Sequence, residues 1–466
     1  MLVIELRRHS QLSLARQLYQ ILRDQMTAGQ LPPGELLPST RELARQLEVS
    51  RNTTYEAYEM LSAEGYIVSR PGSQTRVADG LCLEKPVSAP QSLPQKTESQ
   101  LNYLADFRTG RPDLRRFPQH LWLQLLRKTS ETLSPAHWGY SGPEGLPALR
   151  EEIAAWLLRS RGLAVDPECI FITAGATQAL YLLAGLLAGK NREIIVEDPC
   201  HIGMLRVLQS KGFQIRPVPV DQQGMQTAYL QNKGACAVYV TPSHQFPLGG
   251  ILPASRRAEL IRFARDNDLY IIEDDYDSEF RYSGTPVAPL CSMDNERVIY
   301  VGTFSKILFP ALRVGYVVLP PQLHKPWRHL RTHTDVQNPP FEQAALAEYL
   351  RTRKLDKHIQ QMRRLYGQRR QTFLQLAEEI FGNIWIPWGD AAGLHLVLEF
   401  PGRHFDRDFA KNCRQQGIYV TPVEYHSICK GSHLDKLALG YGHLDSEELR
   451  QGLLLLKKPI DNSKLC

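Results

Sequence analysis

The stretch that most constrains the fold is Val301–Tyr316, with the sequence VGTFSKILFPALRVGY, which continues an apolar, strand-like run. A short apolar run bounded by polar residues is typical of a buried β-strand. Its end carries two hydroxyl side chains, Thr303 and Ser305, and then Lys306 and Arg313. A strand that delivers a lysine, an arginine and two hydroxyls to one end indicates a ligand site within a layered fold.

These side chains suit a phosphorylated aldehyde cofactor, because a lysine amine condenses with an aldehyde while hydroxyls and a guanidinium hold phosphate. A second strand-like run, Leu269–Ile272, is followed by Asp274, Asp275 and Tyr276. The ring nitrogen of pyridoxal phosphate takes an acidic partner. We therefore predict pyridoxal phosphate, held by Lys306 as an aldimine with Asp274 at its ring nitrogen. A lone lysine at a strand end is more often a solvated surface residue. The prediction of a cofactor site therefore depends on the acidic residues at the end of the second strand-like run.

Strand-like and helical stretches alternate through the middle of the chain. The strand-like runs are Ile194–Val196, Ala237–Val240, Leu269–Ile272, Val298–Val301 and Val314–Leu319, and the helical stretches include Thr177–Leu187 and Ser255–Asn267. This alternation predicts an α/β fold with a parallel sheet covered by helices and ligands at the carboxyl ends of the strands. Gly175-Ala176-Thr177 opens one of the helices, so its amides and the Thr177 hydroxyl can cradle phosphate, although a plain strand-to-helix turn has the same sequence.

The first eighty residues predict three short helices followed by a hairpin. Leu14, Leu18 and Leu22 recur at helical spacing, Ser39 starts a second helix in a capping-box pattern, and Ser50 caps a third. Two helices joined by a short turn are typical of a helix-turn-helix. The spacing alone fits a small helical packing domain, with no role in DNA binding, equally well.

The stretches LPSTRELARQLEVSRNTTYEAYEMLSAEGYIVSRPGS, IIEDDYDSEFRY and TFSKILFPALRVGY decide between these alternatives. Together they resemble the MocR-type branch of the GntR transcriptional regulators, over nearly the whole chain. The resemblance implies a winged helix-turn-helix at 10–78, a linker at 79–104, a fold-type-I aminotransferase-like large domain at 105–340 and a small α/β subdomain at 341–460. It also implies a homodimer that binds operator double-stranded DNA.

The resemblance assigns functional residues by motif. The implied DNA contacts are Arg41, Ser50, Arg51, Asn52, Thr53 and, in the wing, Gly72. The implied cofactor residues are Lys306, Asp274, Tyr276 at the phenolic oxygen, the Ala176 amide, Thr177, Thr303, Ser305 and Arg313 at the phosphate, and Tyr140 reaching the phosphate of the other subunit. Ser243 and His244 are both left open as contacts to the phenolic oxygen.

Two positions depart from the family pattern. His201 stands where a tyrosine usually stacks on the pyridine ring, and an imidazole can stack as well. Ala438 stands where aminotransferases carry the arginine that grips the substrate carboxylate. Arg111, Arg115 and Arg206 are the candidates for a displaced clamp.

Composition excludes several classes of protein. The hydrophobic content is 43%, the charged content is 22%, and the eight cysteines form no CxxC pair, which predicts a reduced, cytoplasmic protein without a zinc site or a membrane span. Net charge is +6, yet residues 1–80 hold nine arginines, no lysine and nine acidic residues. DNA binding must therefore depend on local arrangement rather than on bulk charge.

These observations predict a bacterial transcriptional regulator that binds operator DNA and senses a small amine, or pyridoxal phosphate itself, through Lys306. Transaminase activity is expected to be vestigial at most. The alternatives are a metabolic aminotransferase with an N-terminal DNA-binding extension and a regulator that has lost its cofactor.

Overall fold

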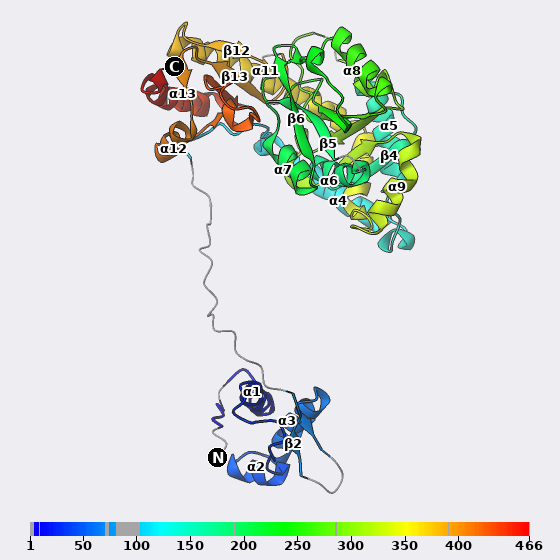
Figure 1. The fold of residues 1–466 in the computed structure, drawn as a ribbon, viewed down its shortest axis with the longest axis vertical. Helices are drawn as coiled ribbons and strands as arrows, with labels where there is room; N and C mark the ends of the chain where they lie inside the picture. Colours follow the sequence, from blue (N-terminus) through cyan, green and yellow to red (C-terminus); the bar gives the residue numbers. More distant parts are fainter. Residues whose placement is uncertain are drawn as a thin grey trace. The chain divides into compact units, whose positions relative to one another are not determined.

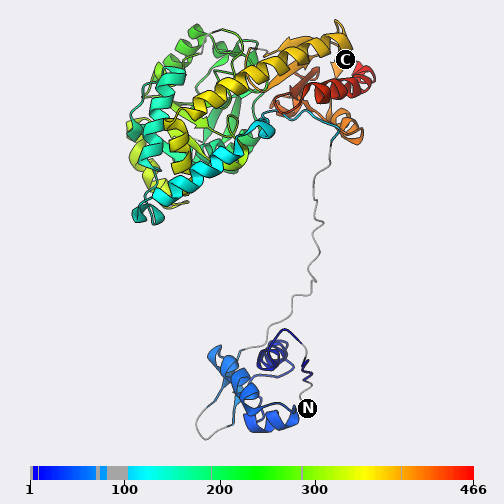
Figure 2. The same ribbon diagram turned by 180° about the vertical axis from the view of Figure 1, so that it is seen from behind.

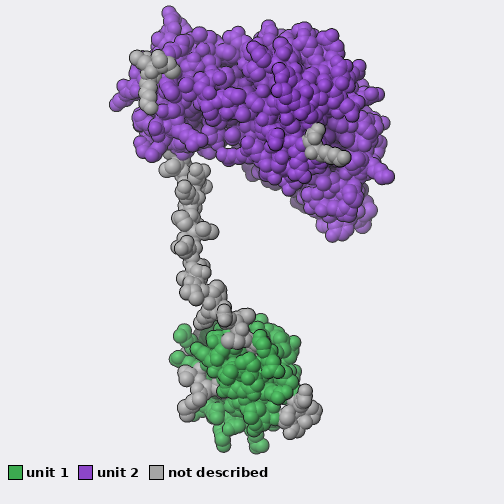
Figure 3. All heavy atoms as spheres, viewed as in Figure 1, with its two compact units in different colours: residues 1–100 green, residues 101–466 purple. Residues whose placement is uncertain are grey.

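The structure is a computed structural model that describes residues 4–8, 10–69, 74–80, 103–189, 192–284, 287–389 and 391–465. The chain divides into two compact units, residues 1–100 and 101–466 (Figure 3). Most of the predicted linker at 79–104 lies outside the described residues, and so does Gly72. Among the helices of the described ranges, none has the length and apolar character needed to cross a membrane.

The first unit is a winged helix-turn-helix. Its elements are α1 (Leu14–Thr27), α2 (Thr40–Gln46), α3 (Arg51–Ala63) and the antiparallel pair β1 (Ile67–Val68) and β2 (Arg76–Val77). Leu18 and Leu22 of α1 pack with Ala57 and Leu61 of α3 in one apolar cluster, all fully buried. The predicted three helices and hairpin are confirmed.

The second unit is built on an eight-stranded sheet (Figure 1). In spatial order its strands are β4 (Ile170–Thr173), β11 (Gly315–Val318), β10 (Val298–Thr303), β9 (Tyr270–Asp275), β8 (Ala235–Val240), β5 (Glu193–Asp198), β6 (Gln214–Asp221) and β7 (Gly224–Met225). β11 runs antiparallel to both its neighbours and β7 antiparallel to β6, so the sheet is mixed and the expectation of a wholly parallel sheet was wrong. β10 and β11 are joined by residues 304–314, which contain no helix long enough to cross the sheet, so the chain returns beside itself and the pair is antiparallel.

Helices cover both faces of this sheet. One face carries α4 (Gln119–Thr132), α5 (Pro147–Arg161), α8 (Ala254–Asp266) and α10 (Pro340–Arg351), and the other carries α6 (Ala176–Leu187), α7 (Ile202–Ser210) and α9 (Pro321–Thr332). Because strand side chains alternate, Ile271 belongs to the first apolar layer and Ile272 to the second. The strands read as continuous apolar runs because both faces are buried.

The C-terminal part forms a small α/β subdomain. Its sheet has the order β12 (Ile386–Trp388), β13 (His395–Glu399), β17 (Lys436–Gly440) and β16 (Thr421–Pro422), covered by α12 (Arg407–Gln415) and α13 (Ser446–Asp461). Two short pairs complete it, β14 (Arg403–His404) with β18 (Lys464–Leu465) and β15 (Ile418–Tyr419) with β3 (Ala105–Asp106). β3 therefore packs with this subdomain, although it lies in the range expected for the large domain.

The helix α11 (Lys354–Phe381) runs from the large sheet to the small subdomain (Figure 2). The sequence predicts one long helical stretch from about Phe341. The structure has two helices, α10 and α11, because Arg353 adopts a left-handed conformation with φ 56° between them. An α-helix cannot continue through such a residue.

Candidate functional site

The recognition helix α3 presents most of the predicted DNA-contacting residues at its first turn. Ser50 caps α3 by accepting a hydrogen bond from the Thr53 amide at 3.2 Å, and the two hydroxyls lie 2.9 Å apart. Arg51 and Asn52 follow the cap and are exposed, and Arg41 is exposed on α2. Exposed side chains at a helix start can reach phosphates and base edges in the major groove.

Buried hydrogen bonds fix the angle between α2 and α3. Thr54 is fully buried and its hydroxyl donates to the Thr40 carbonyl at 2.8 Å, while the Tyr58 hydroxyl donates to the Pro38 carbonyl at 2.8 Å. Both bonds join α3 to the start of α2. The relative positions of Arg41 and Arg51 are therefore set by the core beneath them.

The sequence interpretation missed Tyr55, which is 56% exposed on α3. It follows Arg51 by four residues, so the two side chains share one face of the helix. That spacing was the available signal, and it places a large aromatic side chain beside the predicted DNA contacts.

A cavity of about 270 Å³ lies at the carboxyl ends of the strands of the large sheet. All the predicted cofactor residues except Tyr140 line it. They are Lys306, Asp274, Tyr276, Ala176, Thr177, His201, Thr303, Ser305 and Arg313. The fold thus gathers side chains from segments that are far apart in the sequence.

Lys306 follows β10 and points into this cavity, where its Nζ donates to the Gly110 carbonyl at 2.8 Å. Burial lowers the pKa of Lys306, and Arg111 lowers it further, while Asp277 and Asp274 oppose the shift. A lowered pKa increases the fraction of neutral amine, the form that attacks an aldehyde.

Asp274 offers an acceptor that nothing in the described chain uses. Its Oδ2 accepts a hydrogen bond from the Tyr239 hydroxyl at 2.7 Å, but its buried Oδ1 has no partner among the described residues. Burial raises the pKa of Asp274 to about 6, and the Tyr239 hydrogen bond opposes this. An orphaned carboxylate oxygen in the cavity fits the protonated ring nitrogen of pyridoxal phosphate.

The start of α6 offers a cradle of the kind that can bind a phosphate. Gly175 precedes the helix with φ 90°, and the amides of the first helical turn begin at Ala176 and Thr177. The φ of Gly175 is one that L residues rarely adopt, so glycine is favoured there, and a Cβ atom would also require the Arg313 guanidinium, 2.9 Å away, to shift. Arg313 itself has φ 51°, a costly conformation for a non-glycine residue, and donates to the Ala174 carbonyl at 2.6 Å.

Two hydroxyls complete the phosphate cradle from the end of β10. The Thr303 hydroxyl lies 3.1 Å from that of Ser305 and accepts a hydrogen bond from the Ser305 amide at 3.2 Å. Helix-start amides, two hydroxyls and a guanidinium together match a phosphate dianion.

Tyr276 and His201 line the remaining walls. The Tyr276 hydroxyl lies 3.0 Å from His244 Nδ1, which is itself 2.8 Å from Asp277. His201 caps α7 and lines the cavity, and its ring lies 5.2 Å from that of Phe246 in an edge-on arrangement. Burial and the Lys306 charge lower the pKa of His201, which favours its neutral form.

Neither residue left open for the phenolic oxygen lines the cavity. Ser243 accepts a hydrogen bond from Arg161 at 3.0 Å, and His244 is buried beside Asp277. His244 contacts the Tyr276 hydroxyl without lining the cavity itself.

Tyr140 and Ala438 lie apart from the other predicted positions. Tyr140 is 88% exposed and does not line the cavity of its own chain. Ala438 is fully buried in β17, in an apolar cluster with Leu248, Val397 and Val423. Position 438 therefore contributes no guanidinium to the cavity.

The three arginines considered as a displaced clamp have different surroundings. Arg111 bonds to Asp106 at 2.6 Å and its charge acts on Lys306. Arg115 bonds to Asp113 at 3.0 Å, and Arg206 is exposed on α7.

Sequence interpretation also missed the supports of the cavity, such as Tyr239 and the Gly110 carbonyl. Glu197 is another, because its carboxylate accepts from the Thr241 hydroxyl at 2.6 Å and from the Thr241 amide at 3.0 Å. Burial raises the pKa of Glu197 to about 7. Tyr239 and Glu197 lie inside apolar strands, so no local pattern separates them from core residues.

Comparison with known proteins gives the same two parts. The family described as bacterial regulatory proteins, gntR family, matches residues 14–77, and aminotransferase class I and II matches residues 117–439. The probable rhizopine catabolism regulatory protein MocR of Rhizobium meliloti is 33% identical over 98% of this chain and 95% of its own. The HTH-type pyridoxine biosynthesis transcriptional regulator PdxR of Corynebacterium glutamicum is 38% identical over 96% of each chain.

A solved structure matches the second part. Kynurenine aminotransferase of Pyrococcus horikoshii, in complex with PMP, is 27% identical with a TM-score of 0.71, over 78% of this chain and 92% of that one. The resemblance, the fold class and the cofactor predicted from the sequence are confirmed. The chain therefore belongs to the MocR-type branch of the GntR transcriptional regulators, in which a DNA-binding winged helix-turn-helix is joined to a pyridoxal-phosphate-binding domain with the aminotransferase fold.

Proposed function

We propose that this regulator senses a small amine, or pyridoxal phosphate itself, through Lys306, and that occupancy of the cofactor pocket changes operator binding by a homodimer. The observation that carries the proposal is an intact Lys306–Asp274 pair in a cavity that receives no arginine from position 438. Such a site can exchange amines but lacks the usual grip on a substrate carboxylate.

Each residue of the pocket has a separate task. Bound pyridoxal phosphate supplies an aldehyde carbon at which one amine can replace another. Lys306 provides the resident amine, and its lowered pKa makes it a ready leaving and returning group. Asp274 would hold the proton of the ring nitrogen with its unpaired Oδ1, and Tyr276, oriented by His244, would donate to the phenolic oxygen.

The phosphate would be held by the α6 amides at Ala176 and Thr177, by Ser305 and by Arg313, with Thr303 orienting the Ser305 hydroxyl. The partner subunit's Tyr140 would complete this set. Tyr140 is 88% exposed in one chain, so its side chain is accessible to a second copy.

The buried Ala438 narrows the effector class. A carboxylate that enters a partly buried site loses hydration and needs a charged, preferably bidentate, partner. Of the three candidate arginines, Arg111 is the one whose charge acts on Lys306, yet Asp106 already binds it. We therefore expect common α-amino acids to bind weakly and transamination to be slight or absent.

The names of the relatives support both kinds of effector. One relative is a probable regulator of rhizopine catabolism and another a regulator of pyridoxine biosynthesis. The higher identity, 38%, is to the pyridoxine regulator, which favours the cofactor as the signal. A metabolic aminotransferase is disfavoured because residues 14–77 match the gntR family and because the regulator relatives match nearly the whole chain.

Titration of the cofactor-loaded protein tests the proposal. The twenty amino acids, simple amines and pyridoxal phosphate are added in turn while visible absorbance and release of a labelled operator fragment are followed together. Pyridoxal phosphate is also added to the cofactor-free protein bound to the operator. We expect release by pyridoxal phosphate in that case, or release of the cofactor-loaded protein by an amine without an α-carboxylate. Tight exchange with a common α-amino acid would contradict the effector class, and an operator affinity that responds to no compound would contradict sensing.

A further inference from the structure

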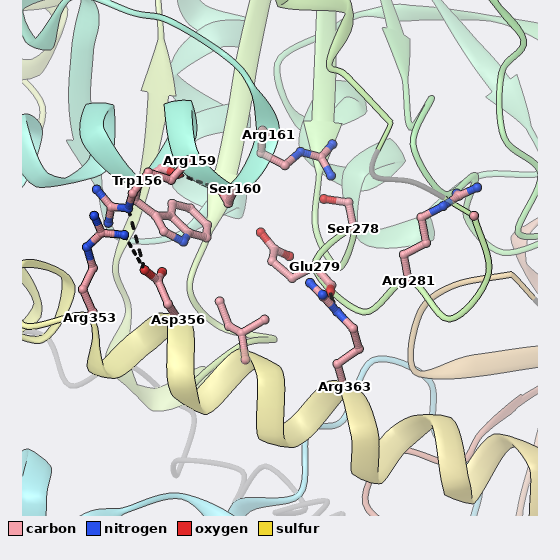
Figure 4. A pocket seen from close by; sticks show the side chains of 12 residues that line it. Trp156, Arg159, Ser160, Arg161, Ser278, Glu279, Arg281, Arg353, Asp356 and Arg363 are labelled. Carbon is pink, nitrogen blue, oxygen red and sulfur yellow. Dashed lines mark hydrogen bonds and ion pairs between the residues drawn. The ribbon is translucent and has the colours of Figure 1, made fainter.

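A second cavity, of about 330 Å³, lies between the end of α5, the loop Ser278–Gly284 after β9, and the first turns of α11 (Figure 4). It shares no lining residue with the cofactor pocket. Its charged lining is strongly basic. The cationic residues are Arg159, Arg161, Arg281, Arg353 and Arg363, and the acidic ones are Glu279 and Asp356.

Ion pairs with carboxylates neutralise only part of the positive charge of these arginines. Asp356 is approached by Arg353 at 3.2 Å and by Arg159 at 3.7 Å, as the dashed lines in Figure 4 show. Among the described residues, no carboxylate lies within ion-pair distance of Arg281 or Arg363. The Arg363 Nε donates instead to the backbone carbonyl of Glu279 at 2.8 Å.

The lining also holds donors without acceptors. Trp156 Nε1, Arg161 Nε and Arg281 Nε are buried and have no hydrogen-bond partner within the described part of the chain, and the same holds for the Ser278 hydroxyl. Trp156 is 2% exposed and Arg161 is 6% exposed. Buried donors are nearly always paired in native proteins, so three such N–H groups around one cavity indicate a missing acceptor.

Glu279 does not oppose an anionic occupant. Burial, and then the charge of Asp275, raises the pKa of Glu279 to about 8. The raised pKa reduces the negative charge that Glu279 presents to the cavity. Asp275, which pairs with Arg161 at 2.7 Å, is not part of the cavity lining, so it offsets only one of the five arginines.

We propose that this cavity binds a small metabolite that carries at least two negative charges on oxyanion groups, either a phosphate ester or a dicarboxylate. Its volume is that of a small-ligand site. Two arginines without carboxylate partners can each grip an oxyanion through paired N–H groups. Trp156, whose N–H lacks an acceptor within the described residues, stands in the same lining. The proposal does not depend on which effector occupies the cofactor pocket.

Calorimetric titration of the full chain tests the proposal. The cofactor is first fixed to Lys306 by borohydride reduction, so that its phosphate cradle is filled. Sodium pyrophosphate, 3-phosphoglycerate and succinate are then added at constant ionic strength, with sodium chloride as the screening control. We expect saturable binding of at least one of the three probes, and the preferred probe distinguishes phosphate from carboxylate chemistry.

Matched variants assign that binding to the cavity. The double variant Arg281→Gln/Arg363→Gln is expected to bind the preferred probe at least about 10-fold more weakly, because two charged hydrogen-bonding groups are lost. Arg364→Gln, the exposed neighbour on the same helix, should bind like the wild type. The visible spectrum and the unfolding temperature without probe show whether the double variant is folded.

Trp156→Phe provides a second, milder test, because it keeps an aromatic side chain and removes the indole N–H donor. It should weaken binding about threefold and remove the change of tryptophan fluorescence that accompanies binding. Absence of saturable binding by every probe would overturn the proposal. Equal affinity in wild type, the double variant and Trp156→Phe would overturn it as well.

Discussion

The DNA-facing residues of α3 and the residues of the cofactor pocket differ in how the chain supplies them. Arg51, Asn52 and Thr53 are consecutive on one helical turn, and the first two are exposed. Ala176, Asp274 and Lys306 come from separate strand ends and meet in one cavity. Consecutive, solvated contacts are expected to act nearly independently, whereas buried groups that share one ligand depend on each other.

The largest expected effect is that of Lys306→Ala, which removes the amine that holds the cofactor. We expect complete loss of the visible absorbance band after reconstitution with pyridoxal phosphate. Lys325→Ala, an exposed lysine on α9, is the control and should keep the band. A wild-type protein that stays colourless after reconstitution would contradict the assignment of Lys306.

Asp274→Asn should lower cofactor affinity without changing the shape of the pocket. Loss of a hydrogen bond to a charged group costs about 1.5–3 kcal/mol, or roughly 10- to 100-fold in affinity. The measurement is titration of the cofactor-free protein with pyridoxal phosphate. Operator binding by the cofactor-free variant is the control, since the DNA-facing residues belong to the other unit. Unchanged cofactor affinity would mean that the orphaned Oδ1 does not face the ring nitrogen.

Arg51→Ala is expected to weaken operator binding by about 1–3 kcal/mol if the arginine contacts a base edge. Arg41→Ala should weaken binding to every sequence and flatten the salt dependence, as expected for a phosphate contact. Neither change should alter the visible spectrum. Arg16→Ala, exposed on α1, is the control. Unchanged operator affinity in both variants would show that the DNA-binding face is placed wrongly.

Asp274 also predicts a pH dependence of the cofactor-free protein. Its pKa is raised from 3.8 to about 6, so its contribution to stability is present below the ordinary value and is lost as the pH rises through about 6. From pH 5 to pH 7.5 the wild type should lose on the order of 1 kcal/mol more stability than Asp274→Asn. Urea unfolding of both proteins at the two pH values measures this. The other buried carboxyls are common to both and cancel, so equal pH dependence would contradict the burial of this group.

The smallest expected effect is that of Tyr140→Phe, which would remove the solvent-exposed hydroxyl proposed to reach the cofactor phosphate of the partner subunit. The loss is about 0.5–1.5 kcal/mol, a few-fold in cofactor affinity. Light scattering of wild type and variant should give the mass of a dimer in both cases. A monomeric wild type, or an unchanged cofactor affinity in a dimeric Tyr140→Phe variant, would mean that the partner subunit contributes nothing to the site.

The same contrast explains what the sequence could predict. The caps Ser39 and Ser50 act on residues three positions away, so local patterns predicted α2 and α3 closely. Lys306, Arg313 and Asp274 were found because each lies next to a buried strand that ends at the same edge of the sheet.

Long-range pairing could not be predicted in this way. The antiparallel direction of β11 depends on which neighbours it meets, and β6 escaped notice because Pro217 and Pro219 interrupt its apolar pattern. Tyr239 resembles any buried aromatic residue until β8 is placed beside β9. The break between α10 and α11 arises from the left-handed conformation of Arg353, and no glycine stands at this position to predict it.

The central claim is that occupancy of the Lys306 site controls operator binding. The most direct measurement compares operator affinity of the wild type and of Lys306→Ala, each without cofactor, with pyridoxal phosphate, and with pyridoxal phosphate plus an amine that changes the wild-type spectrum. The account predicts that at least one addition shifts the wild-type affinity while Lys306→Ala stays unchanged throughout. Identical shifts in both proteins, or none in the wild type, would contradict it.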